Sequence, residues 1–436
     1  MSKYIIKTYG CQMNEHDSEI LSYTLESMGY SKTTELKDAD LIIYNTCAVR
    51  KNAENKVYGN LGWLKGDPYF KDKIICVCGC MMQSEEIRNY ILKTFENVNI
   101  IFGTNNIDKL GEYIDEYKCT GKTVVDIKDQ NSYTEKTFNA IRPYEFKSFV
   151  NITYGCNNFC TFCIVPYTRG RERSRLQKDI VDEVKYLTND GVKEIMLLGQ
   201  NVNSYGKALK DGTNFAGLLK ELNSIRELKR IRFMTPHPRD ITDEFLECYG
   251  ELDRLMPQLH LPVQSGSDKV LKDMNRHYDT DKYYKIVEKA RKIRPDISFS
   301  TDIIVGYPTE TEGDFEDTLD LVKNVKFDTS FTFIFSPRPH TPAANLKPLP
   351  DEIVKDRFNR LTEIMNQIQY DNQIDTIGKN FEVLYESYDA KANTIEGRNE
   401  YGRLVVASGN KDDIGKIITT RINNINTFTS YGEQIE

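Results

Sequence analysis

The sequence has no run of apolar residues long enough to cross a membrane and no secretory leader with an apolar centre. It also lacks the positive net charge that is common among nucleic-acid-binding proteins, because its formal net charge is −7 at pH 7. We therefore expect a cytoplasmic protein that makes no membrane contact and meets any nucleic acid through local basic clusters. A chain of 436 residues is long enough for two or three domains with sizeable cores.

Ten cysteines are present, and in a reducing compartment they are better interpreted as metal or catalytic ligands than as disulfides. Three of them, the central triad, form a C-x3-C-x2-C loop after a strand-like segment: Cys156, Cys160 and Cys163. No fourth cysteine or histidine lies close by in the sequence. A structural zinc site usually has four protein ligands, whereas three thiolates leave one metal position open to a small molecule. The pattern favours an iron-sulfur cluster over a labile zinc loop or three unrelated core thiols.

Four arginines follow this loop with only one acidic residue among them: Arg169, Arg171, Arg173 and Arg175. A run of charge is usually a solvated face of the protein. Here the run lies directly beside the predicted reaction centre, which favours contact with an anionic substrate.

Strand and helix patterns alternate over residues 1–118, which predicts a small doubly wound α/β domain. One cysteine follows each of the first three predicted strands, and we call this set the N-terminal triad: Cys11, Cys47 and Cys80. The carboxyl ends of parallel strands meet at one edge of a sheet, so the three loops should lie together. Cys76 and Cys78 compete for the third position but fall inside the strand. Residues 119–140 are polar and irregular, and we interpret them as a linker.

Six strand-like segments alternate with helices over residues 141–372. Six strands are too few for a closed eightfold barrel, so the pattern predicts a TIM-like partial (β/α)6 barrel with its active residues at the carboxyl ends of the strands. The open side would admit a macromolecular substrate. Residues 373–436 contain short β-rich runs separated by glycines, which predicts a small antiparallel β-barrel of a kind that often binds RNA. This segment has a net charge of −3, so shape and base stacking would have to contribute to binding.

The central cysteine loop, with the aromatic Phe162 before its third cysteine, resembles the signature of the radical S-adenosylmethionine (SAM) enzymes. Combined with the N-terminal triad and the terminal barrel, it resembles the methylthiotransferases, whose three modules cover essentially the whole chain. The resemblance implies two 4Fe-4S clusters, one on the central triad that also binds SAM and an auxiliary one on the N-terminal triad. It also implies that the terminal barrel is an OB-like TRAM domain that binds RNA.

Within that family, residues 8–19, the segment around Cys47 and residues 198–206 resemble the branch that makes 2-methylthio-N6-isopentenyladenosine at position 37 of tRNA. The branches that act on threonylcarbamoyladenosine or on an aspartate of a ribosomal protein carry different residues here, and they remain the alternatives. A more remote alternative is a noncatalytic RNA-binding protein with structural metal. Two incomplete cysteine sets argue against it, because structural sites usually have closed coordination.

The resemblance implies that one SAM methylates a sulfur on the auxiliary cluster, while another is cleaved to a 5′-deoxyadenosyl radical that activates carbon 2 of the adenine. It implies three partners for a chain that we expect to be a monomer: the tRNA anticodon stem-loop, an electron donor of the flavodoxin or ferredoxin type, and a sulfur donor system.

Further residues lie where SAM is bound in similar enzymes: Phe162, Gln200, Asn201, Asp302 and Gly306. Packing at strand ends explains each of the last four equally well. His260 and Gln264 are candidate pocket residues, and His16 is a candidate to orient the auxiliary cluster. A single histidine is, however, more often a hydrogen-bonded core residue than a catalyst or ligand.

Overall fold

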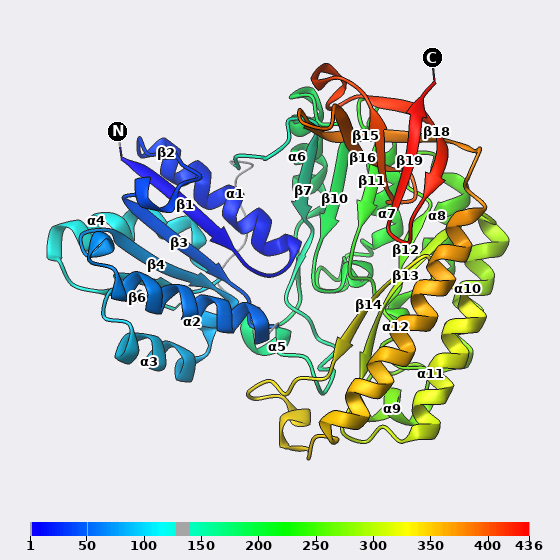
Figure 1. Ribbon diagram of the computed structural model, residues 1–436, viewed down its shortest axis with the longest axis horizontal. Helices are drawn as coiled ribbons and strands as arrows, with labels where there is room; N and C mark the ends of the chain where they lie inside the picture. The colour runs from blue at the N-terminus through cyan, green and yellow to red at the C-terminus, as the bar shows by residue number, and fades with distance from the viewer. Residues whose placement is uncertain (1, 50, 128–139, 436) are drawn as a thin grey trace.

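The computed structural model describes residues 2–49, 51–127 and 140–435. Three regions follow one another along the chain: an N-terminal α/β region, an open barrel and a small terminal β-barrel (Figure 1). No helix within the described residues is long and apolar enough to cross a membrane.

The N-terminal region is built on a six-stranded parallel sheet. Its strands are β1 (Lys3–Thr8), β2 (Ser31–Lys32), β3 (Leu41–Thr46), β4 (Ile74–Gly79), β5 (Ile100–Phe102) and β6 (Val124–Asp126), in the order β2-β1-β3-β4-β5-β6. The helices are α1 (Gln12–Ser27), α2 (Lys51–Gly66), α3 (Glu85–Thr94) and α4 (Leu110–Thr120). Successive residues of a strand point to opposite faces, so Leu41 and Ile43 pack toward α1 and α4 while Ile42 and Tyr44 pack toward α2. The predicted doubly wound domain is confirmed.

The predicted linker is corrected at its first residues. Helix α4 continues to Thr120, and β6 pairs in parallel with β5, so this part of residues 119–140 belongs to the sheet domain. Val124 is buried there. Two adjacent valines in a polar stretch are too short a run to predict a strand without knowledge of the neighbouring strand. The rest of the predicted linker falls mostly on residues 128–139, which lie outside the described residues.

Six parallel strands form the open barrel: β7 (Lys147–Asn151), β10 (Glu194–Leu198), β11 (Arg230–Phe233), β12 (Gln258–His260), β13 (Ser298–Val305) and β14 (Thr329–Ile334). They form two sheets, β7-β10-β11 and β12-β13-β14, which a parallel bridge between Ile231 and Leu255 links. Among the described strands, β7 and β14 do not pair with each other, so the barrel is open between them. The prediction of six strands with an open side is confirmed.

Helices cover the outside of this barrel. They are α6 (Gln177–Asn189), α7 (Phe215–Asn223), α8 (Asp243–Glu251), α10 (Thr280–Ile293), α11 (Glu312–Val325) and α12 (Asp351–Ile374). Two short helices, α5 (Val165–Thr168) and α9 (Asp268–Asp273), and a two-stranded sheet of β8 (Thr153–Tyr154) and β9 (Arg173–Ser174) lie among the loops that follow the strands. Apolar side chains of strands and helices form one large core.

The terminal region is a closed barrel of β15 (Asn380–Asp389), β16 (Thr394–Asn399), β17 (Leu404–Ser408), β18 (Ile417–Ile425) and β19 (Thr429–Gln434). All neighbours pair antiparallel except β17 and β19, which are parallel, so the predicted barrel is confirmed but is not wholly antiparallel. The sequence did not reveal β16 or β19, because both consist largely of polar residues and contain a glycine.

The terminal barrel packs on the amino-terminal end of the open barrel (Figure 1). Arg230, the first residue of β11, donates to the Glu382 carbonyl oxygen at 2.7 Å, and Lys147, the first residue of β7, pairs with Glu386 at 2.8 Å. In a parallel barrel the loops that carry chemistry lie at the opposite, carboxyl end. The terminal barrel therefore contacts the core at the end opposite the central triad.

Candidate functional site

The N-terminal triad lies at the carboxyl edge of the first sheet, as predicted. Cys11 is the N-cap of α1 after β1, Cys47 follows β3, and Cys80 follows β4 directly. Gly10 allows the first two loops to meet, because a Cβ atom added to it would lie 2.7 Å from the Cβ of Cys47. The pKa of Cys80 is raised to about 12, mainly by burial; Arg169 opposes the increase, and the nearby Cys47 and Cys11 add to it. The competing Cys76 and Cys78 are instead buried in the sheet core.

Two asparagines hold these loops together, and sequence reasoning did not identify them. The Asn14 amide nitrogen donates to the Thr46 carbonyl oxygen at 2.8 Å and to Asn45 Oδ1 at 3.2 Å. The Asn45 amide nitrogen donates in return to the Asn14 carbonyl oxygen at 2.8 Å. Both asparagines stand within three residues of a triad cysteine, and that proximity was the available signal.

The central triad occupies the loop after β8, at the carboxyl end of the open barrel. Residues that follow α9 hold its shape: the Asn275 amide nitrogen donates to the Phe159 carbonyl oxygen at 3.0 Å, and Phe159 has a positive φ of 48°. Burial raises the pKa of Cys156 to about 11 and that of Cys163 to about 12, and the Cys160 thiol nearby adds to both increases. The three thiols therefore lie within electrostatic range of one another.

Each triad offers three thiols, one fewer than the four protein ligands that a structural zinc site usually has. A zinc ion requires its thiolates about 2.3 Å from a single centre, whereas each thiolate of a 4Fe-4S cluster binds a different iron, so its thiolates stand farther apart. Three thiolates per cluster leave one iron without a protein ligand. Since ligation requires thiolates, the raised pKa values mean that cluster binding releases protons.

The predicted set of four RNA-binding arginines is corrected for two members. Arg169 is buried, and its guanidinium donates to Cys80 Sγ at 3.3 Å and pairs with Asp17 at 3.0 Å. Arg175 is also buried and pairs with Glu183 at 2.6 Å. Buried protein partners hold both side chains, which removes them from the predicted phosphate clamp. Arg171 is exposed and Arg173 half-buried, so these two remain candidates.

Arg169 and Gln200 join the two triads physically. Arg169 belongs to the segment after the central triad, but its guanidinium reaches Cys80 of the N-terminal triad. Burial lowers the pKa of Arg169, but Cys80 and Asp17 outweigh burial and hold this pKa well above its ordinary value. Gln200, after β10, accepts a hydrogen bond from the Gly155 amide beside the central loop and donates to Met13 Sδ on α1 at 2.7 Å. The two cysteine loops thus face one space between the N-terminal region and the core.

The other predicted SAM-site residues lie at or near the carboxyl ends of the barrel strands, but the structure gives several of them ordinary packing roles. Asn201 is buried and donates to Asp240 at 2.7 Å, and Phe162 packs in an apolar cluster with Val270 and Met274. Asp302 is half-buried, with its carboxylate 3.7 Å from His260 Nε2.

Two further candidates from the sequence, His16 and Gln264, both make specific contacts. His16 bonds Glu19 at 2.9 Å and packs edge-on against Phe149 of β7, at the contact between the N-terminal region and the core. Gln264 has a positive φ of 71°, and its backbone amide donates to the Asp302 carbonyl oxygen at 2.8 Å. Gln264 thus links the loop after β12 to β13.

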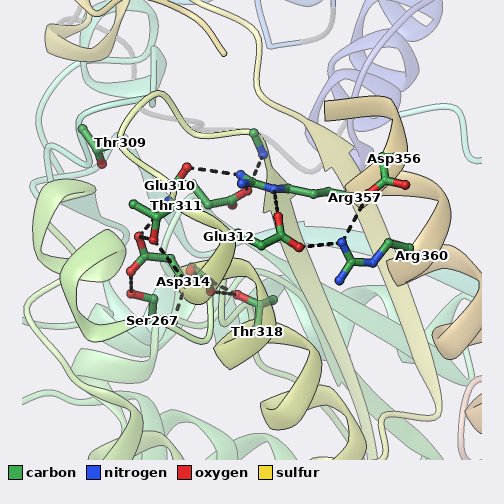
Figure 2. Close-up of polar contacts among 12 residues, drawn as sticks. Ser267, Thr309, Glu310, Thr311, Glu312, Asp314, Thr318, Asp356, Arg357 and Arg360 are labelled. Carbon is green, nitrogen blue, oxygen red and sulfur yellow. Dashed lines mark hydrogen bonds and ion pairs between the residues drawn. The ribbon is translucent and has the colours of Figure 1, made fainter. Parts of the chain in front are cut away.

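Gly306 is hydrogen-bonded to a network of ion pairs that the sequence did not reveal. Figure 2 shows the charged members of this network, Glu310, Arg357 and Glu312. The φ of Gly306 is +77°, and its amide donates to Glu310 Oε1 at 3.3 Å. Glu310 is buried and pairs with Arg357 of α12 at 2.7 Å, and burial raises the pKa of Glu310 although Arg357 opposes the increase. Arg357 also pairs with Glu312 at 3.0 Å. This network fixes the turn at the carboxyl end of β13, where the predicted SAM site lies.

A cavity of about 670 Å³ lies where all three regions meet. Its lining includes Gln12 beside Cys11, Met196 and Phe331 from the barrel strands, and Arg403 and Phe428 from the terminal barrel. Its volume falls within the range of small-molecule sites, and its lining mixes apolar and polar groups as such sites do. A flipped nucleoside is of suitable size for it.

Comparisons with known proteins agree with this architecture. Residues 150–322 match the family described as "Radical SAM superfamily", and residues 3–103 match "Uncharacterized protein family UPF0004". Among solved structures, the radical S-adenosylmethionine methyltransferase TsrM from Kitasatospora setae aligns with a TM-score of 0.57 at 13% identity, covering 79% of this chain and 77% of that one. At that identity the likeness shows the fold alone. Fold and cysteine loop together define a radical SAM protein.

Full-length relatives identify the family within this class. A protein of Clostridium beijerinckii named tRNA-2-methylthio-N(6)-dimethylallyladenosine synthase is 50% identical over 99% of this chain and 95% of its own length. A protein of the same name from Clostridium perfringens is 47% identical over 99% of this chain and 98% of its own length. The chain belongs to the tRNA-2-methylthio-N(6)-dimethylallyladenosine synthase family. The predicted resemblance to the methylthiotransferases is therefore confirmed.

Proposed function

We propose that this protein is an enzyme that methylthiolates carbon 2 of N6-isopentenyladenosine at position 37 of tRNA. The observation that carries the proposal is that two cysteine triads, far apart in sequence, face one space and are connected through Arg169 and Gln200. A methylthio transfer needs a radical source and a sulfur source within reach of one substrate atom. Family membership at about 50% identity over the whole chain selects the isopentenylated adenosine over the alternative substrates.

Each triad has a distinct role in this proposal. The central triad would hold a 4Fe-4S cluster that binds SAM, and the N-terminal triad would hold an auxiliary 4Fe-4S cluster that carries the transferred sulfur. When bound, these groups supply the radical and the sulfur, and the protein supplies ligation, orientation and exclusion of water. Asn14 and Asn45 fix the loops of the N-terminal triad, and Glu310 fixes the turn at Gly306.

The substrate base has to leave the anticodon stack to reach this space. The cavity between the three regions, whose lining reaches Gln12 beside Cys11, is the proposed approach to it, with Phe331 offering a half-exposed aromatic face on the open side of the barrel. Arg171 and Arg173 would contact phosphates near the central loop, which position the RNA without specifying its sequence. Specificity for the isopentenyl group would come from apolar burial in the pocket.

Sulfur and electrons are consumed at every turnover, so the proposal includes two external partners. One is a sulfur donor system that restores the auxiliary site, and the other is an electron donor of the flavodoxin or ferredoxin type. We propose that the protein acts as a monomer in the cytoplasm, where tRNA is modified.

The test is mass spectrometry of tRNA nucleosides from a strain that lacks this gene. Deletion is expected to remove 2-methylthio-N6-isopentenyladenosine and to leave N6-isopentenyladenosine in its place. A plasmid copy should restore the methylthio nucleoside, and a matched copy with Cys80→Ala should not. Unchanged methylthio-isopentenyladenosine in the deletion strain would contradict the proposal, and loss of methylthiolated threonylcarbamoyladenosine would assign the alternative substrate.

A further inference from the structure

A second buried arginine, Arg276, contacts the central triad. It follows α9 in the chain, and its Nη1 donates to Cys160 Sγ at 3.2 Å. Its other donors meet neutral acceptors, the Tyr278 hydroxyl at 3.1 Å and the Pro262 carbonyl oxygen at 3.1 Å. Only 5% of the residue is exposed, so water does not offset its charge. These contacts fix the guanidinium against the ligand sulfur.

Within the described parts of the chain, no Asp or Glu forms an ion pair with Arg276. The groups that its guanidinium meets are the Cys160 thiol, the Tyr278 hydroxyl and the Pro262 carbonyl oxygen. Arg169 at the other triad differs, because Asp17 pairs with it at 3.0 Å. A buried cation without a counter-charge is strongly unfavourable. The group at Cys160 is therefore expected to carry the compensating negative charge.

We propose that Arg276 raises the reduction potential of the cluster held by the central triad, acting through Cys160. The proposal rests on the proposed function only in requiring a 4Fe-4S cluster at that triad, and it is independent of the RNA substrate. In the reduction step the cluster gains one electron and the external donor, of the flavodoxin or ferredoxin type, loses one. A fixed positive charge and an N–H donated to a ligand sulfur stabilise the reduced form more than the oxidised form, because the reduced form is more negative.

The experiment is a redox titration with dithionite, followed by electron paramagnetic resonance, on the full chain with Cys11, Cys47 and Cys80 replaced by alanine. Only the central cluster then contributes to the signal. Arg276→Met removes the charge without burying an unpaired amide, and Arg276→Lys keeps the charge. Tyr278→Phe is the matched control, because it removes a neutral hydrogen bond from the same guanidinium. Iron content and SAM affinity are measured for each variant.

Arg276→Met is expected to lower the ratio of reduced to oxidised cluster about tenfold at a fixed potential, which is a shift of about 59 mV for a one-electron couple. Arg276→Lys and Tyr278→Phe are expected to change the ratio less than about threefold, since both keep the charge. If Arg276→Met does not retain iron, the test depends on Arg276→Lys. A change of about tenfold in the ratio of reduced to oxidised cluster in Arg276→Lys would overturn the proposal, because this variant keeps the charge.

Two further results would also overturn the inference. An iron-loaded Arg276→Met protein with the parental potential would show that the charge does not tune the cluster, and lost SAM affinity at that unchanged potential would assign Arg276 to SAM instead. Absence of iron from the parental protein would overturn both this inference and the proposed function. Either of the two results above would overturn this inference alone, so the two failures are distinguishable.

Discussion

Glu194 of the open barrel pairs with three cations whose side chains also contact the terminal barrel, and replacing it by glutamine should destabilise the protein at neutral pH. The carboxylate is buried and pairs with Arg232 at 2.9 Å, Lys147 at 3.3 Å and Arg230 at 3.7 Å. Burial alone would raise its pKa, but the three cations outweigh burial and lower it from 4.5 to about 2. At about 1.4 kcal/mol per pH unit, that difference corresponds to about 3 kcal/mol of stability.

The sign of the pH dependence follows from the lowered pKa. Folding favours the ionised carboxylate, so its contribution is fully present above pH 4.5 and is lost as the pH falls toward 2. Thermal unfolding of the wild-type protein and Glu194→Gln should therefore differ at pH 7 by about 6 °C, taking roughly 2 °C per kcal/mol for a large domain. The difference should shrink as the pH is lowered below 4.5.

The matched control is Glu244→Gln. Glu244 pairs with Lys220 at 3.4 Å, but both side chains are more than 40% exposed, so water screens the pair and it contributes little to stability. Equal melting temperatures of wild-type and Glu194→Gln protein at pH 7 would contradict a stabilising role of the ionised carboxylate, as would a difference between them that persists undiminished at pH 3.

Three other predictions concern the triads and the arginines. Anaerobically reconstituted protein should contain about eight irons, and alanine at all three cysteines of the central triad should leave about four; iron analysis checks this, and full retention would contradict the cluster assignment. Arg169→Met should reduce the iron held by the N-terminal triad, because Cys80 loses a donor and Asp17 loses its cation. Arg171→Met, at an exposed position, should leave that iron unchanged, and equal iron in both variants would contradict the role of Arg169. Neutralising Arg171 and Arg173 should weaken RNA binding, measured by fluorescence anisotropy. The slope of log binding constant against log salt concentration should become shallower by about 0.7 to 0.9 per lost phosphate contact, and an unchanged slope would exclude these arginines from the RNA interface.

The fold could largely be predicted from sequence where strands are buried on both faces. The core strands β3, β4 and β10 are largely apolar runs flanked by helices, and they stand out without any knowledge of their neighbours. The short β6 and the polar β16 and β19 depend on a partner strand, which supplies their hydrogen bonds. A sequence pattern does not contain that information.

The cysteine positions of the site were predictable for a similar reason. Each N-terminal cysteine follows a recognisable strand, and parallel strands bring their carboxyl ends together. The partners of the arginines were not predictable, because Arg169 meets Asp17 and Arg357 meets Glu310 only after distant segments have packed. A run of arginines that looked like a single basic surface is in fact divided between the interior and the surface.

The most direct test of the proposed methylthiolation is the reaction itself with RNA of defined sequence and modification. Reconstituted protein, SAM and dithionite are incubated with an anticodon stem-loop that carries either N6-isopentenyladenosine or adenosine, and the nucleosides are analysed by mass spectrometry. We predict that 2-methylthio-N6-isopentenyladenosine forms roughly tenfold to two-hundredfold faster than any product from the unmodified RNA, since an apolar pocket loses about 1 to 3 kcal/mol when its group is missing. Equal turnover of the two RNAs, or methylthiolation of a ribosomal protein and of neither RNA, would contradict it.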